Sequence, residues 1–131
     1  MAKRPAQPRL LADENTSHRF VSACTRLRRD FPIIHIARWQ DGSWLGLDDA
    51  GLLISCAEAG LVLVAFDRAT LPWHAGQVVR AGEDHGGLIL FRRTVQSTNY
   101  GDQARLVNDF WFGEGRRWDW TNRIVYLPKS P

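Results

Sequence analysis

The stretch LVLVAFD, residues 61–67, decides the fold. Its six consecutive apolar residues predict a strand that is buried on both faces and ends where Asp67 brings the first charge. Strands buried on both faces are typical of parallel sheets that helices cover on each side. We therefore expect an α/β protein that has this segment as its strongest strand.

The segments around this strand alternate between strand-like and helix-like patterns. Further short apolar runs predict strands at residues 9–12, 33–37, 87–91 and 122–127. Apolar side chains at helical spacing predict helices between residues 17 and 30, and at 49–60, 70–81 and 100–112. The pattern predicts a three-layer α/β/α fold with a central, mostly parallel sheet of four to five strands. We expect right-handed crossovers between the strands, with the last strand at an edge.

Length and composition favour one soluble domain. The chain has 131 residues, of which we interpret 1–8 as a flexible basic tail and 9–131 as a single domain. Its apolar runs are shorter than the roughly 18–20 residues of a membrane span, and the basic start lacks the apolar stretch of a secretory signal. These features predict a cytoplasmic protein without a membrane partner. Cys24 and Cys56 fall in helix-like segments, where we expect two buried, free thiols.

The basic residues are nearly all arginine. The net charge is only +3, and Lys3 and Lys129 are the two lysines among the 17 basic residues. The guanidinium group of arginine forms paired hydrogen bonds with phosphate oxygens, so this excess of arginine is a weak indication of nucleic-acid binding. Trp111, Trp118 and Trp120 could stack on bases, or they could fill a core or a dimer seam. We favour the structural role for these tryptophans.

Three aspartates stand where the predicted elements meet the sheet edge. Asp13 ends the first strand, Asp49 begins the second helix, and Asp67 ends the third strand. Any one of them alone is more often a turn or cap residue, and neighbouring Asp48 fits a plain helix start. Ligands of open parallel sheets bind beyond the carboxyl ends of the strands, where all three would lie. Clustered carboxylates suit Mg²⁺ or Mn²⁺, which assist phosphodiester cleavage.

Four motifs occur in an order that resembles a known family. They are LLADEN (10–15), DAGLLISCAEAG (49–60), VLVAFD (62–67) and GGLILF (86–91). Together they resemble the compact PIN-like domains of bacterial toxin–antitoxin operons, related to VapC toxins, over about residues 9–93. The resemblance implies a PIN-like fold and a small ribonuclease, often a toxin silenced by an antitoxin.

The resemblance also implies roles for single residues. Asp13, Asp49 and Asp67 match acids that bind Mg²⁺ or Mn²⁺ and carry catalysis, and Asn15 matches the asparagine that orients the first acid or contacts phosphate. Phe66 stands where the family usually has arginine. The chain also lacks the further glutamate that such domains usually carry between the first two acids.

Three more residues, Asp48, Arg68 and His85, are candidates for supporting roles. Arg68 could contact phosphate or neutralise the acids, and His85 could face the site from the start of the fourth strand, although a loop histidine is more often merely exposed. We expect an RNA substrate and a DNA-binding antitoxin partner, and a homodimer is an alternative that stays open. The main alternative is a degenerate PIN-like module that binds RNA or protein without cleavage. A response-regulator receiver ranks lower, because no lysine ends a late strand.

Overall fold

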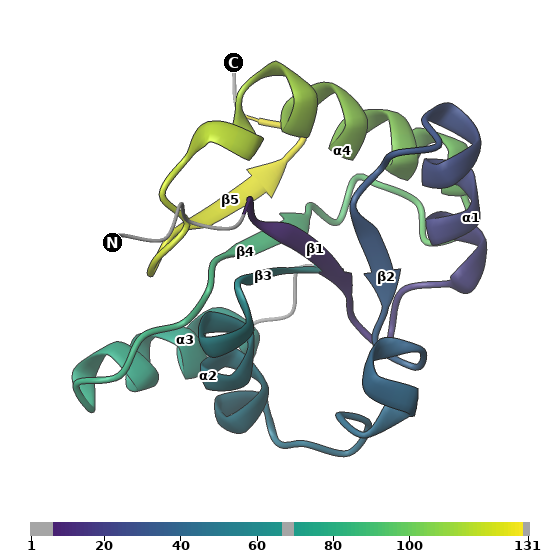
Figure 1. Ribbon diagram of the computed structural model, residues 1–131. Coiled ribbons are helices and arrows are strands. Elements are labelled where there is room, and N and C mark those ends of the chain that lie inside the picture. The colour runs from purple at the N-terminus through teal and green to yellow at the C-terminus, as the bar shows by residue number, and fades with distance from the viewer. Residues whose placement is uncertain (1–6, 67–69, 130–131) are drawn as a thin grey trace, which may run out of the picture.

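A computed structural model describes residues 7–66 and 70–129, and it confirms a three-layer α/β/α fold (Figure 1). Residues 1–6 of the expected tail, together with Asp67 and Arg68, lie outside the described residues. The strands are β1 (Arg9–Ala12), β2 (Ile33–His35), β3 (Leu61–Phe66), β4 (Leu88–Phe91) and β5 (Ile124–Leu127). They form one sheet in the order β2-β1-β3-β4-β5, and every neighbouring pair is parallel. As expected, β5 lies at an edge.

The helices lie in two pairs on opposite faces of the sheet. They are α1 (His18–Leu27), α2 (Asp49–Ala59), α3 (Thr70–Arg80) and α4 (Tyr100–Gly113), with short 3₁₀ turns at Trp39–Gly42 and Gly115–Arg117. Figure 1 shows α1 beside α4 above the sheet, and α2 beside α3 below it. We refer to these as the α1/α4 face and the α2/α3 face.

Local sequence explains where the helices begin and end. The hydroxyl of Ser17 accepts a hydrogen bond from the Arg19 backbone N–H at 3.0 Å, which caps α1. The carboxylate of Asp48 accepts from the Gly51 N–H at 2.7 Å, which caps α2. Gly60 ends α2 with a φ of 70°, a left-handed conformation that glycine adopts without strain.

The core consists of two layers, one on each face of the sheet. Alternating residues of β3 point to opposite sides, so that Val62 and Val64 pack under α1 and α4 whereas Leu61 and Leu63 pack under α2 and α3. Trp111 and Trp120 are buried in the α1/α4 layer, which confirms their structural role. Cys24 and Cys56 are buried and free, one in each layer.

The last crossover departs from the expected handedness. From β3 to β4 and from β4 to β5 the chain moves in the same direction across the sheet, but α3 covers one face and α4 the other. The first three crossovers are right-handed and the last is left-handed, a rare arrangement (Figure 1). Because α2 and α3 both take the opposite face, α4 has to cover β3 and β4 on the α1/α4 face. Burial of this apolar surface therefore outweighs the usual preference.

Within residues 7–66 and 70–129, no helix combines the length and the apolar character needed to cross a bilayer.

Candidate functional site

The topology places a switch point at the carboxyl ends of β1 and β3. These strands are neighbours, yet the chain leaves β1 toward α1 on one face, and the helix that follows β3 lies on the other. Ligands of open α/β sheets bind at such a switch point, outside the carboxyl ends of the strands. Helices that return from these strand ends also begin at this edge, where their dipoles are positive. We therefore treat this edge as the candidate site.

Asp13 follows β1 directly and is held in place by its own backbone. Its N–H donates to the Val64 carbonyl at 2.9 Å, and its carbonyl accepts from the N–H and the hydroxyl of Thr16 at 2.9 and 2.6 Å. Alternation along the strand after Leu11 puts the Asp13 side chain on the α2/α3 face. Only 3% of Asp13 is exposed, so its carboxylate lies almost completely out of water at this edge.

Asp49 approaches the same edge from the first turn of α2. Its carboxylate lies 3.7 Å from Nε2 of His74 on α3, and both side chains are partly exposed. Sequence reasoning assigned no role to His74, because only the packing of α3 against α2 brings it to Asp49. Asp48 is exposed and serves as the helix cap.

Cys56 shows that Asp13 and α2 are close. Burial, with a smaller contribution from the negative charge of Asp13, raises the pKa of the Cys56 thiol to about 12. Cys56 is therefore a neutral thiol at physiological pH and offers neither a thiolate ligand nor a nucleophile. Asp13 and Asp49 offer carboxylate oxygens at this edge, the ligands preferred by Mg²⁺ and Mn²⁺.

The described residues do not form a complete metal site on their own. No group of three His, Cys, Asp or Glu residues able to hold a metal occurs in the part of the chain that the structure describes. Asp67, the expected third ligand, and Arg68, the expected phosphate contact, lie outside that part. Asp67 directly follows Phe66, the last residue of β3, the strand that pairs with β1.

His35, by contrast, has a structural role. Its Nδ1 accepts from the Ala37 N–H at 3.1 Å, so Nε2 carries the proton that is donated to the Thr16 carbonyl at 2.9 Å. The ring stacks on His18 with centroids 3.9 Å apart. Burial lowers the pKa of His35, the hydrogen bond to Thr16 opposing this in part, and keeps the ring neutral.

His85 does not belong to the candidate site. It precedes β4 and therefore lies at the amino edge of the sheet, where Pro8 and Gly60, which precede β1 and β3, line the same small cavity. Its Nδ1 accepts from the Gly87 N–H at 3.1 Å, and its backbone is tied to Asn122. The expectation was wrong because a residue before a parallel strand faces the edge opposite to a residue after it. Asn15 does lie at the carboxyl edge, exposed in the turn between β1 and α1.

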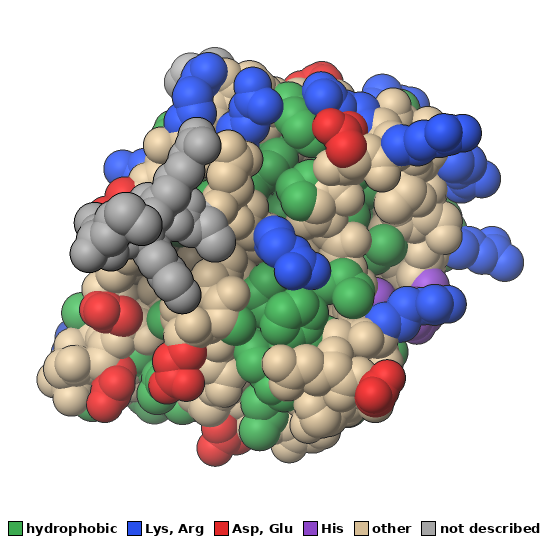
Figure 2. Space-filling view, in the orientation of Figure 1, with side chains coloured by type: hydrophobic (Ala, Val, Ile, Leu, Met, Phe, Trp, Pro, Cys, Tyr) green, Lys and Arg blue, Asp and Glu red, His purple; other side chains and the backbone are tan. Residues whose placement is uncertain are grey.

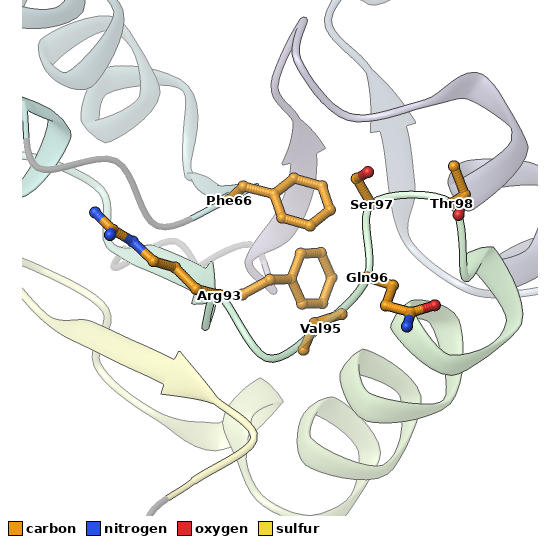
Figure 3. A pocket seen from close by; sticks show the side chains of 7 residues that line it. Phe66, Arg93, Val95, Gln96, Ser97 and Thr98 are labelled. Atoms are coloured by element: carbon orange, nitrogen blue, oxygen red, sulfur yellow. The ribbon is translucent and has the colours of Figure 1, made fainter.

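A pocket of about 520 Å³ opens at the carboxyl ends of β3 and β4 (Figure 3). Phe66 and the buried Phe91 form its apolar wall, with ring centroids 5.2 Å apart. The loop after β4 forms its polar side, and the pocket opens on the α1/α4 face. Sequence reasoning missed this pocket, because the loop has no regular pattern and Phe66 was seen only as a missing arginine.

Comparison of the chain with protein-family models, with curated proteins and with solved structures returns no match. Function therefore has to be inferred from the chemistry of the site.

Proposed function

We propose that this protein is a metal-dependent endoribonuclease of the PIN-like type, with Mg²⁺ or Mn²⁺ held by Asp13, Asp49 and Asp67. The observation that carries the proposal is the placement of two acids at one switch point. Asp13 is buried at the end of β1 on the α2/α3 face, and Asp49 begins the helix that covers that face. Asp67 joins them in the proposal because it follows the last residue of β3, the neighbour of β1.

The chain's own residues suit this chemistry. The backbone of Asp13 is tied to Val64 and Thr16, which limits its movement when a cation is absent. His74 lies near Asp49 and can orient its carboxylate. A bound divalent ion would polarise the phosphodiester and activate water, so no nucleophilic side chain is required. The neutral thiol of Cys56 agrees with a mechanism that has no covalent step.

Charge on the surface supports an RNA substrate. Figure 2 shows basic side chains gathered over the top and right of the molecule, where α4 and α1 lie. Exposed arginines on these helices and on the turn after α4 are Arg19, Arg26, Arg105, Arg116 and Arg117. They can neutralise phosphates along a strand that reaches the carboxyl edge. We further propose a toxin role with an antitoxin partner, on the resemblance of the four sequence motifs alone.

Conservative substitution of each proposed ligand tests the proposal. Asp13→Asn, Asp49→Asn and Asp67→Asn should each lower the rate of RNA cleavage with Mn²⁺ by about a hundredfold or more, because each removes a negative ligand of the divalent ion that stabilises the phosphate charge. EDTA should abolish cleavage by the unchanged protein. Cleavage would be followed by gel electrophoresis of labelled RNA.

Asp48→Asn and Glu14→Gln are the matched controls. Each is an exposed acid next to a proposed ligand, and asparagine caps a helix as well as aspartate does. Both variants should cleave like the unchanged protein. Full activity in the three ligand variants, with their fold intact, would refute the proposed site.

A non-cleaving RNA- or protein-binding module is the second candidate. It is favoured by the aromatic Phe66 beside the expected site and by the lack of the further glutamate that PIN-like domains usually carry. This candidate predicts RNA or partner binding that survives Asp67→Asn, and no turnover at any Mn²⁺ concentration. The same cleavage series therefore separates the two candidates.

A further inference from the structure

We propose that the Phe66 pocket holds an unpaired base of a single-stranded RNA, with Phe66 as its stacking platform. The Phe66 pocket is the cavity lined by Phe66 and Phe91, by Arg93 and Val95, and by loop residues 96–98. The inference rests on the proposed function, because it assigns the substrate strand of the same site.

The shape and chemistry of the pocket suit a base. Its volume of about 520 Å³ lies within the usual range for small-ligand pockets, about 300–1,000 Å³. Phe66 is partly exposed and rests on Phe91, which is fully buried and so fixes the platform from below. A ring held in this way offers a flat face to any base, since every base has a π-face.

The loop after β4 adds polar residues to the lining of the pocket. Within the described chain, the side chains of Gln96, Ser97 and Thr98 make no hydrogen bonds, and all three are exposed. An amide and two hydroxyls supply both donors and acceptors, the combination that reads the edge of a base. Figure 3 shows the Phe66 ring turned toward the loop that carries Ser97.

The backbone of this loop is held in place. The buried side chain of Gln103 on α4 donates from Nε2 to the Gln96 carbonyl at 2.8 Å, and the Asn99 N–H donates to the same carbonyl at 3.1 Å. Val95 is buried in the α1/α4 layer. The polar side chains are therefore presented on a fixed frame, which lowers the entropic cost of binding.

The position of the pocket favours single-stranded RNA over double-stranded RNA. Phe66 lies at the end of β3 and faces the α1/α4 side. Asp13 follows β1 and lies beside Ala65 of β3, and its side chain faces the α2/α3 side. A strand crossing this edge can place a base on Phe66 and the next phosphate toward the carboxylates. Arg93 is exposed and extends away from the Phe66 ring (Figure 3), where it can contact the strand's backbone. A duplex cannot bind in this way, because its bases are already stacked.

Binding in the absence of metal tests the pocket without requiring cleavage. A fluorescein-labelled short single-stranded RNA would be titrated with protein in EDTA, and binding followed by anisotropy. Phe66→Ala should weaken binding about tenfold or more, because stacking on one ring is lost. Phe66→Tyr keeps the ring and should bind within about twofold of the unchanged protein. The same RNA in a duplex should be insensitive to Phe66→Ala.

Trp73→Ala is the control. Trp73 is an aromatic residue that is 59% exposed on α3, which covers the opposite face of the sheet, so its loss should not change RNA affinity. Unchanged RNA affinity in a folded Phe66→Ala variant would refute base binding in the Phe66 pocket, even if the protein cleaves RNA in a reaction that depends on Asp13. Weakened affinity in Phe66→Ala with rescue by tyrosine supports the pocket, even if no cleavage is found with Mn²⁺. Failure of the pocket and failure of the nuclease can thus be told apart.

Discussion

Two buried histidines connect single residues to the stability of the whole chain. Nδ1 of His35 accepts from the Ala37 N–H and Nδ1 of His85 from the Gly87 N–H, so protonation would break both bonds. Burial is the main cause that lowers the pKa of each ring below its ordinary value of 6.5. Below that pH the unfolded chain binds more protons than the folded chain, so acid favours unfolding.

The free energy of unfolding should therefore decrease as the pH falls from about 7.5 through 6.5 toward about 5. Asparagine at position 85 can keep an acceptor for the Gly87 N–H but does not titrate in this range. His85→Asn should thus show a weaker decrease than the unchanged protein in urea denaturation across these pH values. Parallel pH curves for the two proteins would contradict the role given to His85.

Residues at the site could be predicted only in part. Asp13 and Asp49 were identifiable because strand ends and helix starts are visible in the sequence, and both lie at the expected edge. His74 could not be found, because its proximity to Asp49 depends on how two helices pack. Phe66 was misjudged because its neighbours in the pocket come from a loop nearly thirty residues later.

At the scale of elements, the cap of α2 determines how Asp49 is presented. The Asp48 carboxylate satisfies the Gly51 N–H, one of the donors that the first turn cannot pair internally. Asp48→Ala should lower the free energy of unfolding by about 0.5–2 kcal/mol, whereas Asp48→Asn should change it little. Denaturant titration of the three proteins measures the difference. Equal losses in both variants would show that charge rather than capping is what matters there.

Most elements were predictable because each carries its own signal. The apolar runs at 9–12, 61–66 and 87–91 match β1, β3 and β4 to within a residue, and caps at Ser17 and Asp48 fix two helix starts. The layer to which α4 belongs was not predictable in this way. Its apolar stripe could pack on either face of the sheet. It packs on the α1/α4 face because α2 and α3 already cover the other face.

At the scale of the whole molecule, the α1/α4 layer should dominate stability. Trp111 is 1% exposed and packs among β-strand and helix side chains of this layer, whereas Trp73 on α3 is 59% exposed. Trp111→Ala should cost about 3–5 kcal/mol, a large share of the roughly 5–15 kcal/mol that stabilises a domain. Trp73→Ala should stay within about 0.5 kcal/mol.

Thermal and urea unfolding of both tryptophan variants would check this difference. A small loss in Trp111→Ala, comparable with that in Trp73→Ala, would mean that the layer can collapse around the missing ring. The α1/α4 layer would then be less tightly packed than the burial of its side chains indicates.

The left-handed crossover from β4 to β5 also affects the order in which parts of the chain can fold. Residues 18–27 leave the ribosome early, but the helix that shields them comes some eighty residues later. Contacts between such distant segments form slowly. Until they form, the nascent chain exposes hydrophobic side chains such as Phe20 to solvent and to other proteins. Synthesis of this small protein is therefore the period in which it is most exposed to aggregation.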